Sequence, residues 1–80
     1  MRILDEKTNK GVNLLTLLLK KQEAEQLVAY LNLLLESESS KDHHHLSNDD
    51  YSKEITIALY EENDIEHFSD RCKELILHDK

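Results

Sequence analysis

Hydrophobic positions separate the 80-residue chain into blocks of different period, and the clearest block is Lys21–Glu36. There the apolar residues recur at the spacing of one helical stripe, namely Ala24, Leu27, Val28, Leu31, Leu34 and Leu35. Leu33 lies about 180° from Ala24 at ~100° per residue, and Tyr30 lies on the flank of the stripe. The pattern predicts an amphipathic helix over 21–36, with Tyr30 and Leu33 available for contact with a partner.

The preceding segment, Val12–Leu19, is apolar nearly throughout and shows no helical stripe. In an extended conformation it has two apolar faces, one of which carries Leu15, Leu17 and Leu19. Such a segment is typical of a strand that is covered on both sides. Because leucine has a high helix propensity, a single helix from about Val12 to Glu36 is the competing interpretation.

The rest of the chain supplies two further strands and a second helix. Arg2–Thr8 predicts an edge strand, and the turn after it ends at Gly11, since asparagine and glycine tolerate positive φ. Alternating residues predict a strand over Glu54–Tyr60. A stripe from Ile65 to Ile76 predicts a final helix from about Asp64 to His78.

These elements predict an α+β fold with a small three-stranded sheet and two helices, in the order β-β-α-β-α. We expect a single domain spanning 1–80, because a chain of this length holds one core. The first two strands would form a hairpin, and the second and third would run parallel through a right-handed crossover. Residues at about 37–53, rich in His, Ser and Asp, form a polar stretch that predicts a long loop.

The predicted sheet leaves one face without a covering layer, because two helices cover only one side of it. Exposed apolar patches of this size commonly mark interfaces. We therefore expect a homodimer or a complex with another protein, through the residues Leu15, Leu17, Leu19, Tyr30 and Leu33. In the alternative arrangement, the helices straddle the sheet and the monomer is complete.

The charge of the chain narrows the choice of partner. Its formal net charge is −7, from 17 acidic and 10 basic residues. This field repels phosphate backbones, so we expect no nucleic acid as partner. A basic protein is a natural complement, and a small bacterial-type accessory protein of the immunity or antitoxin kind has this character. Solubility alone is the alternative explanation of the charge.

Cysteine content and hydropathy predict a cytoplasmic protein with no membrane partner. Cys72 is the one cysteine, so no disulfide can form within the chain, and its place on the final helical stripe predicts a core residue. Acidic residues near the N-terminus do not fit a signal peptide. The longest apolar run is far shorter than the ~20 residues of a membrane span.

The run His43–His45 is the most distinctive candidate for chemistry. In an extended segment His43 and His45 point the same way, so the pair can share a divalent transition metal such as zinc, nickel or copper. The candidate oxygen ligands are Asp42, Asp49, Asp50 and Glu54. The same histidines would permit a pH response, and a solvated polar loop is the alternative. No catalytic or phosphate-binding motif is present, so we expect neither an enzyme nor another cofactor.

Overall fold

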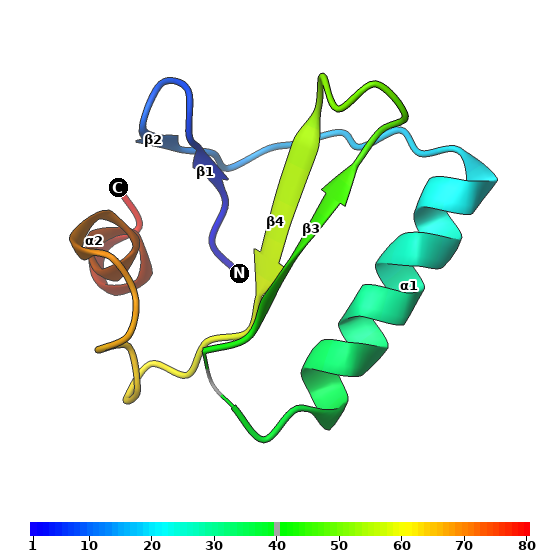
Figure 1. The fold of residues 1–80 in the computed structure, drawn as a ribbon. Helices are drawn as coiled ribbons and strands as arrows, with labels where there is room; N and C mark the ends of the chain where they lie inside the picture. Colours follow the sequence, from blue (N-terminus) through cyan, green and yellow to red (C-terminus); the bar gives the residue numbers. More distant parts are fainter. Residues whose placement is uncertain (40) are drawn as a thin grey trace. The chain divides into compact units, whose positions relative to one another are not determined.

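The computed structural model describes residues 1–39 and 41–80, and within them the chain forms two compact units. The hairpin unit is Leu18–Tyr60, and the terminal unit combines Met1–Leu17 with Glu61–Lys80. Figure 1 shows the elements in chain order: β1 (Leu4–Asp5), β2 (Lys10–Gly11), α1 (Lys21–Glu36), β3 (His43–Ser47), β4 (Glu54–Ala58) and α2 (Asp70–His78).

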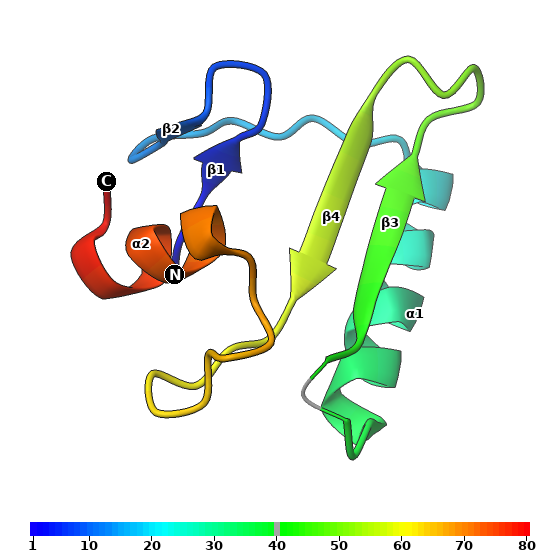
Figure 2. The same cartoon turned by 60° about the vertical axis from the view of Figure 1, so that its left-hand side comes forward.

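In the hairpin unit, α1 lies along one face of an antiparallel hairpin made by β3 and β4 (Figure 2). Directly opposed residues of an antiparallel pair share a face. The register sets His44 opposite Ile57 and Leu46 opposite Ile55, so these four side chains share one face. Leu46 is buried there, as is Leu34 of α1. The core of this unit therefore lies between α1 and the hairpin.

The helix α1 has the bounds that the apolar spacing predicts. At its start the backbone N–H of Lys20 donates to Glu23 Oε1 at 2.9 Å, which is the glutamate half of a capping box. At its end the N–H of Ser37 donates to the carbonyl of Leu34 at 3.3 Å. The residues before Lys21 are not helical. The competing interpretation of one helix from about Val12 is therefore wrong.

The terminal unit contains a short hairpin, in which β1 pairs with β2 and Leu4 lies opposite Gly11. Asn9 takes the left-handed conformation in the turn, with φ 59°, as asparagine does readily. A Cβ on Gly11 would lie 3.1 Å from Leu75 Cδ1, so glycine permits the close approach of β2 and α2. The N-terminal part of the chain therefore packs directly on the second helix.

Polar contacts join the same parts of the terminal unit. The Arg2 guanidinium donates from Nε to the carbonyls of Leu75 and Ile76, at 3.0 and 3.2 Å. These carbonyls lie in the last turn of α2, where a cation is favourable. The apolar core of the unit consists of Ile65, Leu75 and Ile76.

The prediction of a single three-stranded sheet is wrong, although the class is α+β. The described residues form two separate two-stranded antiparallel sheets. Val12–Leu19, the expected central strand, contains no strand in the structure. The β4 strand pairs instead with β3, which lies inside the stretch 37–53 for which the sequence predicts a loop. A local hairpin has a lower loop-closure entropy cost than a parallel crossover through a helix, which accounts for this pairing.

The second helix also begins later than the sequence predicts. It starts at Asp70, where the Ser69 side chain caps it by accepting from the N–H of Cys72 at 3.2 Å. The residues before it form turns, with the N–H of Asp64 bonded to the carbonyl of Glu61 at 3.0 Å. The side-chain cap at Ser69 satisfies an N–H that would otherwise have no partner in the first turn.

Candidate functional site

The apolar stripe of α1 divides into two rows that have different environments. The inner row consists of Leu27, Tyr30 and Leu34, which are buried or half-buried. The outer row consists of Ala24, Val28, Leu31 and Leu35, all of which are exposed. At ~100° per residue, the centres of the two rows lie about 100° apart around the helix. A two-stranded hairpin covers the inner row alone.

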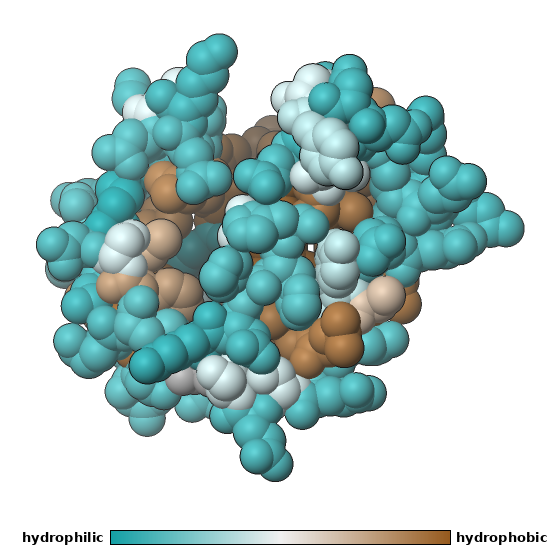
Figure 3. Space-filling model, in the orientation of Figure 1, coloured by the Kyte–Doolittle hydropathy of each residue, from teal (hydrophilic) through white to brown (hydrophobic). Residues whose placement is uncertain are grey.

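The outer row presents large apolar side chains to solvent. The exposed fractions are 57% for Val28, 40% for Leu31 and 72% for Leu35. In Figure 3, hydrophobic side chains reach the surface as separate patches among hydrophilic ones. The members of the outer row follow one another at steps of four, three and four residues, which is the a/d spacing of a helix that packs against another helix. The outer row is therefore a candidate contact surface.

The residues that the sequence predicts as an interface lie in different structural environments. Leu15 and Leu17 are exposed, at 58% and 47%, in the extended part of the terminal unit, and Leu19 is half-buried at the start of the hairpin unit. Leu33 is 51% exposed on α1, on a side of the helix away from the inner row. Tyr30 stacks on His44, with ring centroids 5.0 Å apart. The structure does not bring the leucines of 12–19 together as a sheet face.

The sequence predicts one apolar stripe on this helix and does not distinguish the outer row as a surface. Its residues share one stripe with Leu27 and Leu34, which are covered. The stripe is wide, because six apolar residues fall within four turns. The width of the stripe could have indicated an exposed apolar row, because a small unit covers only a narrow part of a helix.

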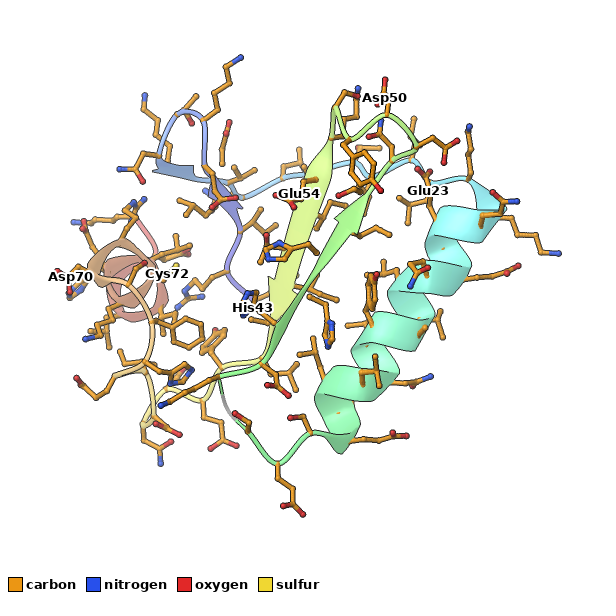
Figure 4. All side chains as sticks on the ribbon, viewed as in Figure 1. Glu23, His43, Asp50, Glu54, Asp70 and Cys72 are labelled. Atoms are coloured by element: carbon orange, nitrogen blue, oxygen red, sulfur yellow. The ribbon has the colours of Figure 1, made fainter. Side chains whose placement is uncertain are left out.

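A second candidate is the face of the hairpin away from α1, here called the histidine face: His43, His45, Glu54 and Thr56. Alternation along β3 places His43 and His45 on this face, and Figure 4 shows His43 and Glu54 on the side away from α1. The rings of His43 and His45 meet edge to face, with centroids 5.0 Å apart. Nδ1 of His45 lies 2.8 Å from Thr56 Oγ1 and 3.5 Å from Glu54 Oε1.

The candidate carboxylate ligands differ in what they contact. Asp42 accepts a hydrogen bond from the hydroxyl of Ser37. Asp49 Oδ2 lies 4.0 Å from Lys20 Nζ. Glu54 Oε1 lies 3.5 Å from Nδ1 of His45. Among the described residues, no group of three His, Cys, Asp or Glu side chains is placed to hold a metal ion.

Asp50 has a structural role in the loop between β3 and β4. Its carboxylate accepts from the N–H of Ser52 at 3.0 Å. Hydrogen bonds from the Ser52 side chain and then from its backbone lower the pKa of the Asp50 carboxyl. Asn48 closes the same loop, since its amide donates to Ser52 Oγ and accepts from the N–H of Lys53, each at 3.0 Å. Asp50 therefore stabilises the turn by accepting a backbone hydrogen bond, as aspartate side chains commonly do in loops.

Comparison of the chain with protein-family models, with curated proteins and with solved structures gives no match. Within 1–39 and 41–80, neither α1 nor α2 combines the length and apolar character that crossing a bilayer requires. The candidate functional surfaces are therefore the two exposed faces of the hairpin unit.

Proposed function

We propose that this protein acts by protein–protein contact and that the outer row of α1 is its contact surface. The observation that supports the proposal is the exposure of Val28, Leu31 and Leu35 on a helix whose other apolar row is already packed. Exposed apolar rows with a/d spacing are the surfaces that helices use to recognise one another. Burial of each such side chain stabilises a complex by up to about 1.5–3 kcal/mol, which makes it effective in binding.

The partner in this proposal is a second copy of the chain or another protein, and a basic protein suits the surface charge. The net charge of −7 favours encounter with a basic partner through long-range attraction. In that form the chain would be an acidic accessory or inhibitory protein, acting in the cytoplasm without catalysis of its own. In the other form the outer rows of two copies cover each other.

Site-specific photo-cross-linking in cells tests the contact surface. A benzophenone amino acid at Leu35 would lie on the outer row, and the same group at Gln26 would lie on the opposite side of α1 as a matched control. The proposal predicts one defined cross-linked species from position 35 and none from position 26. Absence of any species, or equal cross-linking from both positions, would contradict it.

A second candidate function is a metal- or pH-responsive module that uses His43 and His45. Its supporting observation is the 5.0 Å separation of these two rings on one face, with Glu54 beside His45. Neutral imidazoles bind zinc, nickel and copper, so the two rings could supply two ligands to one ion.

Titration calorimetry with zinc, nickel and copper salts tests the metal form of this candidate. The untagged protein should bind one ion per chain, and His43→Gln/His45→Gln should abolish that binding. His78→Gln, which removes a histidine of α2 in the terminal unit, is the control and should bind as wild type does. Equal weak binding by all three proteins would exclude the site.

A further inference from the structure

We infer that the outer row is covered by α1 of a second copy of this chain, with the two helices antiparallel about a two-fold axis. This inference rests on the proposed function, because it names the partner for the same surface. A two-fold interface uses the same patch on both copies, so the patch must be complementary to its own reversed image. The outer row meets that condition in shape and in charge.

The shape condition follows from the residue spacing. The outer row is symmetric about a point midway between Ala29 and Tyr30. Antiparallel pairing about that point places Ala24 of one copy opposite Leu35 of the other, and Val28 opposite Leu31. Each layer then joins a smaller residue to a larger one, which fills the space between the helices evenly.

The charge condition appears at the two ends of the row. Lys21 is the first residue of α1, and Glu38 lies two residues beyond the last one, after the extended cap Ser37. Antiparallel pairing brings Lys21 of one copy close to Glu38 of the other. This contact occurs at both ends of the seam, which is the line along which the two outer rows meet. These opposite charges would flank the apolar layers and set their register, as charged positions do in helical pairs.

The parallel arrangement of the two helices fits these residues less well. It would place Lys21 opposite Lys21 and Glu38 opposite Glu38, which are like charges. It would also stack Ala24 on Ala24 and Leu35 on Leu35, so that one layer is underfilled and another is crowded. The helix dipoles would point the same way and repel, whereas antiparallel dipoles attract.

The pairing leaves the internal packing of the hairpin unit in place. Leu34 remains buried in its own chain, and Tyr30 remains stacked on His44, because both belong to the inner row. From Ala24 to Leu35 the seam is about 17 Å long at 1.5 Å per residue. Two copies can thus associate as folded monomers, and the association should depend on concentration.

Cysteine cross-linking between separately prepared variants tests the direction of pairing. In a Cys72→Ser background, full-length Ala24→Cys and Leu35→Cys proteins are oxidised alone and as a mixture. The inference predicts a disulfide-linked dimer in the mixture, in which residue 24 is joined to residue 35, and little in either protein alone. Efficient dimers from each protein alone would show parallel pairing and overturn the inference, as would the absence of dimers in every arm.

Charge exchange at the ends of the seam is the second arm of the test. Lys21→Glu and Glu38→Lys, made singly, should each raise the dimer dissociation constant about threefold to tenfold. The double variant Lys21→Glu/Glu38→Lys should return it close to the wild-type value, because the opposite charges face one another again. Losses that add in the double variant would overturn the inference.

The two proposals can fail separately. If the photo-cross-linker at Leu35 joins a different protein and the cysteine mixture forms no dimer, the outer row is a contact surface but its partner is not a second copy of the chain. If it joins a segment of the same chain, both proposals fail. A cross-linked species with the mass of two copies supports both.

Discussion

Tyr30 of α1 and His44 of β3 stack face to face, with ring centroids 5.0 Å apart and planes 6° from parallel. This pair connects the helix to the hairpin in a unit whose buried residues are few. The stack therefore contributes to the orientation of α1, and hence to the direction in which the outer row is presented.

Removing the Tyr30 ring should loosen this contact. Tyr30→Ala should lower the free energy of unfolding by about 1–3 kcal/mol, because aromatic pairs contribute beyond their buried area. Tyr30→Phe keeps the ring and should lie within about 0.5 kcal/mol of wild type. Urea denaturation followed by circular dichroism measures both. Equal stability of the alanine and phenylalanine variants would show that the stack does not support the fold.

The two rows of α1 should respond differently to truncation. Leu34 is 4% exposed and its neighbour Leu35 is 72% exposed. Leu34→Ala should cost about 2–4 kcal/mol of unfolding free energy through a cavity in the core. Leu35→Ala should change the stability of the monomer by less than about 0.5 kcal/mol and should weaken association instead. Chemical denaturation at low protein concentration separates the two, and similar losses would contradict the division into rows.

Asp50 should titrate below the ordinary range of an aspartate. The Ser52 hydrogen bonds lower its pKa, so the folded chain favours the carboxylate. This preference is fully present above the unfolded-state pKa and is lost as the pH falls through the lowered pKa of the folded state. NMR titration should show this, and Ser52→Ala should raise the Asp50 pKa because it removes the largest cause. An unchanged pKa in Ser52→Ala would contradict this explanation.

Ser69 should stabilise the first turn of α2. Ser69→Ala removes the acceptor for the N–H of Cys72 and should cost about 1 kcal/mol. Ser69→Asp keeps an acceptor at the cap and should remain near wild type. Hydrogen exchange of the amide of Cys72 is the local readout, and it should accelerate in the alanine variant alone. If exchange is the same in both variants, the cap does not stabilise this turn.

The sequence was informative where local periodicity and local chemistry act together. The helix over Lys21–Glu36 is confirmed at both ends, because its apolar spacing and its Glu23 capping contact favour the same structure. His43 and His45 also share one face, as an extended segment requires. Both inferences depend on residues that lie close together in the chain.

The choice of pairing partner for each strand was beyond the sequence. The segment Val12–Leu19 has the composition of a buried strand, but composition does not determine which other strand it would pair with. The β3 segment, His43–Ser47, looks like a loop because Leu46 is its one apolar residue. It becomes a strand because a turn organised by Asn48 brings it against β4. Tertiary context of this kind overrides propensity.

Sedimentation velocity over a wide range of protein concentration measures whether α1 pairs with α1 of a second copy. Antiparallel pairing of α1 predicts a reversible shift from the 9.4 kDa monomer toward a species of twice that mass. It also predicts that Leu31→Asn/Leu35→Asn stays monomeric at every concentration, with an unchanged circular dichroism spectrum. A wild-type protein that remains monomeric at near-millimolar concentration, or a variant that dimerises as the wild type does, would contradict the antiparallel pairing of α1.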